Sequence, residues 1–507
     1  MIPYFKVLTC ATRLANDGAM KHAYRWLRAL RNVNRYWLND THSGLNRTAV
    51  SQVFEPKTVE EVAQAVRRCR RESKPLAIAG GRHAMGGQQF LRGGAVLDTR
   101  GLKRVRRFDE DRGLLEVDAG IQWPDVLRAY LSRPGGMHSP WGIRQKQTGA
   151  DRLTLGGAVA SNIHGRCLTA APLVGDLESL EVVTADGEVV NCSRHARPEL
   201  FRHVVGGYGL FGIVTAVTLR LTARQQIERV VELRDIDGLI ERLNERIAEG
   251  ALYGDFQFAI DPEHRDFLRK GILSCYIPTG DVKPIPPRQR RLSQADWNRL
   301  IELAHRHKTR AYEEFSAFYL ASSGQRYWSD THQLNLYIES YHSSLDQRLG
   351  SSIHGGEMIT ELYVPRDRLC AFMDDVRRDF LRQPVDLIYG TIRLTERDTE
   401  SALPWAREAY ACVIFNLHVD HDAASILRAK SDFVRLIDRA ITHRGSYYLT
   451  YHRYARADQV LTCHPQLKEW LAVKQRMDPA GLFQSDWYRH LLQTADEDIG
   501  GQQCSAQ

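Results

Sequence analysis

Hydrophobic and polar positions alternate with two different periods in the first half of the chain, and these periods predict its elements. In PKTVEEVAQAVRRCRRESKPLAIAGG (residues 56–81), apolar residues recur at helical spacing at Val59, Val62, Ala63 and Val66. Pro-Lys-Thr precedes this run as a cap, so we predict a helix. The apolar run that ends at Ala79 predicts a strand, and a glycine-rich turn follows it directly.

Short strands with turn signals continue to about residue 224. GAVLDTRGL and GLLEVDAGI read as strands, and QWPDVLRAYL as a helix opened by Pro124. LESLEVVTADGEVVNCS predicts a hairpin that turns at Asp186-Gly187. VVGGYGLFGIVTAVTLRLTAR predicts a long strand after glycines. We therefore expect residues 46–224 to form one domain.

Beyond residue 225 the pattern changes to repeated strand-then-helix units. RVVELRDIDGLIERLNERIAEG, EMITELYVPRDRLCAFMDDVRRDFL and CVIFNLHVDHDAASILRAKSDFVRLIDRAI each have this order. Such units predict an antiparallel sheet covered by helices on one face, here over residues 225–440. The fold class is thus α+β, with a helical extension at residues 1–45 and a frayed tail at 491–507.

Composition and charge narrow the class of protein. The chain has 507 residues, 43% hydrophobic and 26% charged, which is typical of a globular protein with more than one core. It has no apolar run of about 18 residues and no clear secretory signal. Nine scattered cysteines without a CxxC pair argue against zinc and favour a reducing compartment. We therefore expect a cytoplasmic protein without a metal site.

The net charge of +8 is unevenly distributed. In KHAYRWLRALRNVNRYW, basic residues recur at helical spacing beside an apolar stripe of Trp26, Leu30, Val33 and Trp37. A basic amphipathic helix over residues 20–37 either packs on its own protein or lies peripherally on a membrane. No spacing typical of RNA-binding, helix-turn-helix or zinc-finger motifs supports nucleic-acid binding.

Three glycine clusters carry the candidate chemistry. They are AGGRHAMGGQ (79–88), TLGGAVASNIHGRC (154–167) and VVGGYGLFG (204–212). Glycine lets backbone N–H groups approach a phosphate closely. Neither the Walker nor the Rossmann spacing is present. The clusters either line one groove for a dinucleotide or serve only turns and bulges.

The same clusters resemble known signatures in layout and order. GGRHAMGGQ is similar to the flavin loop of the vanillyl-alcohol oxidase superfamily, and TLGGAVASNIHGR resembles its second signature. GGYGLFGIVTAVTLRL and the closing MDPAGLFQSDWYRHL continue the resemblance in order. The chain looks intermediate between alditol or aldonolactone oxidases, decaprenyl-phosphoribose oxidases and cytokinin dehydrogenases. The resemblance implies an FAD-binding domain at residues 46–224, a substrate-binding cap at 225–440 and a segment at 441–490 that returns to the flavin.

Cofactor-binding residues follow from the resemblance position by position. It places the pyrophosphate on the first cluster and implies that His83 bonds covalently to the flavin 8-methyl carbon; a histidine that only packs beside the site is the alternative. The residues that it assigns to FAD are Gly80, Gly81, Arg82, His83, Ala84, Gln88, Gly156, Gly157, Ser161, Asn162, His164, Gly209, Gly212 and Ile213.

The catalytic residues that the resemblance implies lie on the cap and the returning segment. Arg393 would supply a cation near substrate and flavin, and His418 would face the substrate on the next strand, beside Asn416. Tyr451 stands where several relatives have a lysine, followed by His452. Either these residues provide a base or they are packing residues.

The resemblance implies an FAD-dependent oxidoreductase that moves a hydride from the CH–OH group of a sugar, polyol or lactone to flavin N5. Oxygen or an electron carrier would reoxidise the flavin. An amine dehydrogenase is the enzymatic alternative, and a non-catalytic protein of the membrane surface is the alternative of another class.

Overall fold

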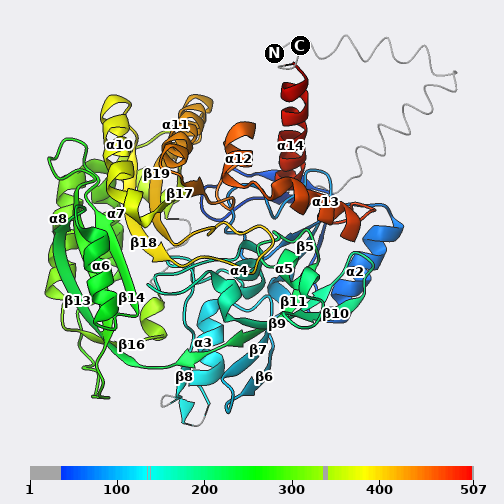
Figure 1. Cartoon of the computed structure of the whole chain (residues 1–507), viewed down its shortest axis with the longest axis horizontal. Helices are drawn as coiled ribbons and strands as arrows, with labels where there is room; N and C mark the ends of the chain where they lie inside the picture. The colour runs from blue at the N-terminus through cyan, green and yellow to red at the C-terminus, as the bar shows by residue number, and fades with distance from the viewer. Residues whose placement is uncertain (1–35, 134, 137–138, 335–340, 505–507) are drawn as a thin grey trace.

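The computed structural model describes residues 36–133, 135–136, 139–334 and 341–504 (Figure 1). Two parts follow one another along the chain, which we name the N-terminal domain (46–224) and the sheet domain (225–440). The elements of the first part are β1 (Tyr36–Leu38), β2 (Thr48–Val50), β3 (Gln52–Phe54), α2 (Val59–Arg71), β4 (Leu76–Ala79), β5 (Ala95–Asp98), β6 (Val105–Asp109), β7 (Leu114–Asp118), α3 (Trp123–Leu131), β8 (Trp141–Gly142), α4 (Leu155–Ser161), β9 (Leu177–Val183), β10 (Val189–Ser193), α5 (Pro198–Val204), β11 (Ile213–Arg220) and β12 (Thr222–Ala223).

The N-terminal domain contains two main sheets. A parallel sheet has the order β3-β5-β4, and a five-stranded antiparallel sheet has the order β10-β9-β11-β7-β6. Helix α2 begins after Thr58, whose side chain accepts a hydrogen bond from the N–H of Glu61. Its buried face packs on β4 and β5. The predicted helices at 59 and 123 and the β9–β10 hairpin are confirmed.

One large antiparallel sheet dominates the sheet domain, with the order β16-β13-β15-β14-β18-β19-β17-β20. Its strands and the remaining helices are β13 (Gln226–Asp235), α6 (Leu239–Ala248), β14 (Tyr253–Phe258), β15 (Lys270–Pro278), α7 (Gln294–Arg306), α8 (Lys308–Ala321), β16 (Arg326–Trp328), α9 (His342–Leu349), β17 (Gly355–Pro365), α10 (Leu369–Arg382), β18 (Leu387–Thr395), β19 (Tyr410–Asp420), α11 (Ala423–Thr442), β20 (Ser446–Tyr447), α12 (Ala457–Cys463), α13 (Leu467–Met477) and α14 (Asp486–Cys504).

Helices lie on both faces of this sheet, so the expectation of a single covered face is wrong. Helices α10 and α11 pack against β17 and β19. Helices α7 and α8 contact β18, β13 and β15, and their side chains line a cavity together with residues of β14 and β18. The physical reason is that strand side chains alternate between the two faces, and apolar residues such as Ile359 and Ile414 stand on the face opposite α10 and α11.

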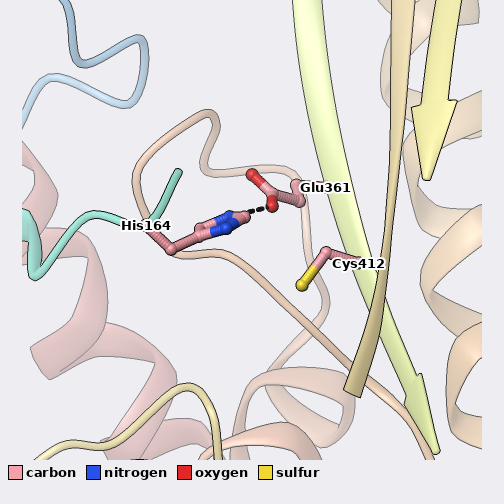
Figure 2. Close-up of side chains that lie close together, drawn as sticks. All are labelled: His164, Glu361 and Cys412. Carbon is pink, nitrogen blue, oxygen red and sulfur yellow. Dashed lines mark hydrogen bonds and ion pairs between the residues drawn. The ribbon is translucent and has the colours of Figure 1, made fainter. Parts of the chain in front are cut away.

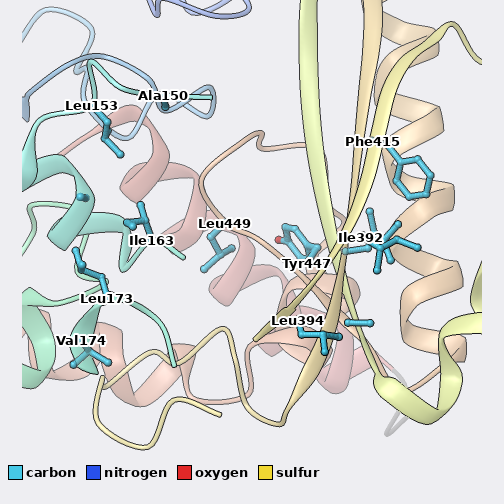
Figure 3. Packing of buried hydrophobic residues seen from close by; sticks show 14 of the residues in the cluster. Ala150, Leu153, Ile163, Leu173, Val174, Ile392, Leu394, Phe415, Tyr447 and Leu449 are labelled. Carbon is cyan, nitrogen blue, oxygen red and sulfur yellow. The ribbon is translucent and has the colours of Figure 1, made fainter. Parts of the chain in front are cut away.

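The two domains share one hydrophobic core. Leu153 and Ile163 of the N-terminal domain belong to the same buried cluster as Ile392 and Phe415 of the sheet (Figure 3). Strand β20 joins the edge of the sheet beside β17. The chain then crosses back, and the carbonyl of Thr450 accepts a hydrogen bond from the N–H of Met85. The two parts are therefore held in a fixed relation around the cavity.

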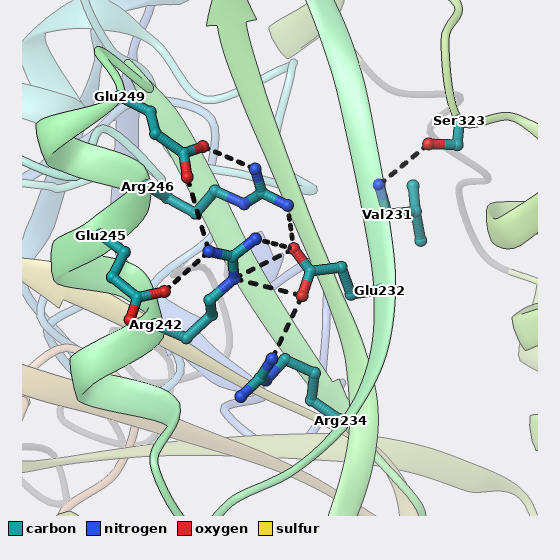
Figure 4. Close-up of polar contacts among 8 residues, drawn as sticks. All are labelled: Val231, Glu232, Arg234, Arg242, Glu245, Arg246, Glu249 and Ser323. Atoms are coloured by element: carbon teal, nitrogen blue, oxygen red, sulfur yellow. Dashed lines mark hydrogen bonds and ion pairs between the residues drawn. The ribbon is translucent and has the colours of Figure 1, made fainter.

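A network of charged side chains attaches α6 to β13 (Figure 4). Arg242 donates to both carboxylate oxygens of Glu232, at 2.7 Å for the shorter contact, and Arg246 bonds Glu232 and Glu249. These arginines lower the pKa of Glu232 to about 2, against the opposing effect of burial. Part of the positive charge of the chain is thus neutralised by ion pairs within the fold.

Two expectations at the chain ends need correction. Residues 36–38, which we predicted as part of a helical extension, instead form strand β1 and pair with β2. Their side chains alternate between the two sides of an extended strand. The rest of that extension, including the basic residues up to 35, lies outside the described residues. Residues from 491 continue helix α14 up to Cys504 instead of fraying. Within the described part of the chain, no helix is long and apolar enough to cross a membrane.

Candidate active site

A cavity of about 870 Å³ lies between the N-terminal domain and the sheet domain. All three glycine clusters contribute to its wall, through Gly80, Gly81, Gly156, Gly157, Gly209 and Gly212. On the other side it is lined by residues of β14, β17, β18 and β19 and by helices α7 and α8. Three segments far apart in the sequence thus form one groove.

Close packing explains why the groove is made of glycine. A Cβ added to Gly81 would lie 2.7 Å from the carbonyl oxygen of Arg152, and one added to Gly80 would overlap the hydroxyl of Thr154. Thr154 caps helix α4 by accepting a hydrogen bond from Gly157 N–H, so it cannot rotate away without loss of that cap. Gly209 has φ of +77°, a conformation that favours glycine.

Two side chains of the first cluster hold the loop. The Arg82 guanidinium donates to Asp98 at 2.7 Å, while Gln88 accepts from Gly86 N–H and donates to the carbonyl of Leu449 at 2.6 Å. Both residues line the cavity, as does Ala84. The loop therefore presents backbone to the groove, and these side chains fix its shape.

His83 lines the cavity at the same loop. Its Nδ1 lies 2.9 Å from Nε2 of His42, and its ring also hydrogen bonds to the backbone carbonyl of Arg152. Burial, with a smaller contribution from His42, lowers the pKa of His83 to about 3. The imidazole is therefore neutral and fixed in orientation at physiological pH.

The sheet wall opposite the groove is polar. Arg393 of β18 is buried and lines the cavity, and its Nε and Nη1 have no hydrogen-bond partner among the described residues. Asn416 of β19 lines the cavity too, and its amide donates to Glu357 at 2.7 Å. Asp255 of β14 lies 3.8 Å from Arg166. The wall thus offers both donors and acceptors to a ligand.

Tyr451, on the segment after β20, reaches the cavity. Its hydroxyl donates to Oε2 of Glu361 at 3.3 Å and accepts from the Gln147 amide at 3.4 Å. Burial and, second, the negative charge of Glu361 raise the pKa of Tyr451 well above its ordinary value. The phenol is therefore protonated at neutral pH.

Five residues that the sequence assigned to the site do not line the cavity: Asn162, His164, Ile213, His418 and His452. Asn162 bonds Asp398 and the N–H of Val174, which makes it a support of the loop. Ile213 packs in the core against α2.

The two histidines expected as bases are placed unfavourably. His452 stacks on Phe433 with ring centroids 4.4 Å apart, and burial lowers its pKa to about 3. His418 shares its strand face with Asn416 but does not line the cavity, and it lies near His305 and 3.4 Å from Asp420. A base must reach the substrate proton, so the structure argues against both assignments.

Comparison with known proteins indicates which ligand the cavity binds. A family model described as an FAD binding domain matches residues 50–193. The decaprenylphosphoryl-beta-D-ribose oxidase of Mycolicibacterium smegmatis is 24% identical over 88% of this chain and 96% of its own length. An uncharacterized oxidoreductase, ORF5 in the fasciation locus of Rhodococcoides fascians, is 35% identical over 36% of the chain and 40% of its own length.

Cytokinin dehydrogenase 6 of Oryza sativa subsp. japonica is 34% identical over 36% of this chain and 36% of its own length. The matched part of the chain therefore spans well under two thirds of the length of several of these relatives. The matched FAD-binding model covers the first two glycine clusters. The chain is a flavoprotein with a PCMH-type FAD-binding domain. This confirms the resemblance to the vanillyl-alcohol oxidase superfamily and the expected cofactor.

The groove of the flavoprotein fits this cofactor. A volume of about 870 Å³ is within the usual range of sites that bury a large cofactor. Gly80 and Gly81 line the cavity, and because they have no Cβ their loop packs directly against Thr154 and Arg152 at its wall. The individual assignments of residues to parts of FAD remain predictions.

Sequence reasoning missed Glu361, which links the site to the protein interior. The flavoprotein buries this carboxylate completely, and Nε2 of His164 bonds its Oε1 (Figure 2). Cys412 lies within 4.8 Å of both groups. Burial raises the pKa of the Cys412 thiol well above its ordinary value, so the thiol is protonated. Since His164 also uses its Nε2 to bond Glu361, we assign no metal ion to these three residues.

The alternation of residues in β17 could have revealed Glu361. In EMITELY, the residues Glu357, Ile359, Glu361 and Tyr363 share one face of the strand. Two carboxylates on a strand that is otherwise buried are a signal for a ligand-facing wall. His42 and Gln147 lie on irregular segments, and no periodicity in the sequence marks them.

Proposed function

We propose that this flavoprotein is an FAD-dependent oxidoreductase that oxidises the CH–OH group of a sugar, polyol or lactone-like compound. FAD, when bound, supplies an acceptor for a hydride. The observation that carries the proposal is that Arg393 of β18 and Tyr451 line the same cavity as the three glycine clusters. A substrate carbon held between wall and groove would lie beside the cofactor.

Likeness over both domains supports a CH–OH donor. The ribose oxidase of Mycolicibacterium smegmatis resembles the chain across 88% of its length, which includes the sheet domain. Cytokinin dehydrogenases 6 and 7 of Oryza sativa subsp. japonica each match 36% of the chain. Because the sheet domain forms the substrate side of the cavity, likeness there bears more directly on the substrate.

Tyr451 is the residue through which the substrate proton leaves in this proposal. Its own pKa is too high for it to act as a free phenolate base. It accepts the hydroxyl proton of the substrate while it passes its own proton to Glu361, to which it is already hydrogen bonded. Substrate thereby loses one proton to the protein and one hydride to the cofactor, which balances the oxidation of an alcohol to a carbonyl.

Arg393 supports the same step by its charge. Its side chain is buried and lines the cavity, and Nε and Nη1 of its guanidinium have no hydrogen-bond partner among the described residues. A fixed positive charge in a site of low dielectric stabilises negative charge that develops during hydride transfer. Oxygen or an electron carrier is the proposed final acceptor.

An amine donor is the second candidate, and Asp255 favours it. This carboxylate lines the cavity, is buried, and lies beside Arg166. A carboxylate in such a place can accept a proton from an amine. It lies on β14, two strands away from β19, on the side of the wall far from Tyr451.

Anaerobic bleaching of the flavin distinguishes the two donors. The purified holoprotein is mixed without oxygen with sugars, polyols, aldonolactones and amines, and the visible flavin absorbance is followed. Bleaching by at least one CH–OH compound is expected. Bleaching by amines alone would contradict the proposal and favour the second candidate.

A further inference from the structure

We propose that Glu357, Asn416 and His342 form a subsite that binds paired hydroxyl groups of an uncharged polyol or sugar and rejects anionic ones. The inference rests on the proposed function, because it names the part of the substrate that this cavity holds away from Tyr451. Glu357 lies four residues before Glu361 on β17, which corresponds to about 13 Å along an extended strand.

The geometry leaves one oxygen of Glu357 available to a ligand. Asn416 donates to Oε2 at 2.7 Å, which fixes the carboxylate plane. Oε1 is buried and has no hydrogen-bond partner among the described residues. Nε2 of His342 lies 3.7 Å and Nε2 of His305 lies 3.8 Å from this oxygen, both beyond hydrogen-bond range.

His342 provides an independent observation, because its polar ring atoms are buried without hydrogen-bond partners among the described residues. It is the first residue of α9, is 8% exposed and lines the cavity. Neither of its ring nitrogens has a hydrogen-bond partner in the described structure. Oδ1 of Asn416 is also buried and unpartnered there. Buried polar groups without partners are costly, so a ligand with several hydroxyl groups would relieve them.

The charge of the subsite selects among ligands. In the described part of the chain, histidines are the only basic side chains within 4.0 Å of Glu357. Burial lowers the pKa of His305 and of His342, so both are predominantly neutral at pH 7. The carboxylate charge is therefore not offset, and a phosphate or carboxylate placed here would be repelled. Hydroxyl donors gain a charge-assisted hydrogen bond instead.

A metal ion is a poorer occupant for these residues. Three ligand atoms within 4.8 Å of one another occur, among the described residues, only at His164, Glu361 and Cys412. Nδ1 of His305 is engaged with the carbonyl of Ile301, which leaves a single nitrogen to face Glu357. The subsite therefore fits hydroxyl groups better than a cation.

Calorimetric binding to the holoprotein tests the subsite with matched probes. Ribitol and D-arabinose are the neutral probes, and D-ribonate and D-arabinonate are their anionic counterparts. The wild-type protein is expected to bind each neutral probe at least about tenfold more tightly than its anion, since the anion brings a second negative charge against the Glu357 carboxylate. Glu357→Gln should weaken the neutral probes by roughly tenfold and shrink the discrimination between the two sets.

Controls keep the outcome specific. Glu263→Gln, at an exposed loop position, should leave all four affinities unchanged. His342→Gln should weaken the neutral probes less than Glu357→Gln, and flavin content should report folding of each variant. The proposal is overturned if neither neutral probe binds, if the anions bind as tightly as the neutral probes, or if Glu357→Gln changes neither affinity nor discrimination.

Metal analysis adds one further decisive outcome. A stoichiometric divalent ion that is present in the wild-type protein and lost in Glu357→Gln would overturn the proposal. Binding does not depend on turnover, so its failure is separate from that of the proposed function. If the affinities behave as expected but no CH–OH compound bleaches the flavin, the proposed oxidation is wrong while the subsite stands.

Discussion

At the scale of single residues, the environment of each group decides its chemistry more than its type does. His83 and His452 both have a pKa lowered to about 3 by burial, but only His83 lines the cavity. A neutral imidazole keeps one unprotonated ring nitrogen, which attachment to a flavin requires. We therefore keep His83 as the proposed attachment point and exclude His452 from direct contact with substrate.

Acid precipitation tests the covalent link. The yellow colour of the wild-type protein should remain with the precipitate, and that of His83→Ala should pass into the supernatant, because the link needs the imidazole. His195→Ala, at an exposed position, should behave like the wild type. Colour entirely in the wild-type supernatant would show that the flavin is not attached.

Replacement of Tyr451 by Phe removes the hydroxyl that joins the cavity to Glu361. The rate of anaerobic flavin reduction should fall by about 10²-fold or more, the contribution that is usual for a group that accepts a proton. Flavin content should be unchanged. Tyr454→Phe, which removes a hydroxyl outside the cavity lining, should leave the rate within about twofold of the wild type, since it touches no reacting group.

The buried carboxyl of Asp176 makes stability depend on pH. Burial raises its pKa from 3.8 to about 6, although Arg144 and Gln145 oppose the shift. Between these values the folded chain holds a proton that the unfolded chain has lost, so this group destabilises the fold as pH rises through the window. The loss amounts to about 3 kcal/mol at most above pH 6.

Asp176→Asn should remove this contribution. Relative to the wild type, the free energy of unfolding of this variant in urea should be larger (the fold more stable) at pH 7.5 than at pH 4.5. An equal difference at the two pH values would contradict the assigned shift.

At the scale of elements, the glycine turns are where sequence pattern and structure agree most directly. The strand β4, the turn after it and helix α4 bring Gly80 against Thr154, so the two clusters pack as one unit. The position of this contact could not be deduced from spacing alone, because it joins residues 74 positions apart. The resemblance to known flavoproteins supplied that link.

Gly80→Ala should loosen this unit and weaken FAD retention. The added Cβ forces Thr154 to rotate, which costs the cap of α4, worth about 1 kcal/mol. We expect a lower flavin content after dialysis and a lower melting temperature. Gly175→Ala is the matched control, since its Cβ would meet only Ala171, at 4.0 Å. Equal flavin content in the two variants would contradict the role given to Gly80.

The sequence predicted some elements well and others not at all. The helix at Val59–Arg71, the β9–β10 hairpin and the three strand-then-helix units follow from apolar period and turn residues. Helices α7 and α8 line the cavity through Trp297, Ile301, Phe315 and Tyr319, and α8 has little helical periodicity of apolar residues that would have marked it in the sequence. The site residues Glu361 and Gln147 depend on tertiary contacts.

At the scale of the whole molecule, the cavity exists because two sheets from different parts of the chain share a core. Trp405 donates to the carbonyl of Asn162 at 2.9 Å, and the amide of Asn162 donates to Asp398 at 2.9 Å. Tyr448 reaches back to the carbonyl of Ser161 at 2.5 Å. These bonds hold the sheet domain against the N-terminal domain around one cavity.

The most direct test of this account is the rate of anaerobic flavin bleaching with a substrate deuterated at its carbinol carbon. Ribitol, D-arabinose and an aldonolactone are compared, and the fastest is repeated in deuterated form. We predict that deuterium slows bleaching several-fold, because the C–H bond breaks as hydride leaves. Absence of bleaching by any CH–OH compound, or equal rates for the two isotopes, would contradict the account.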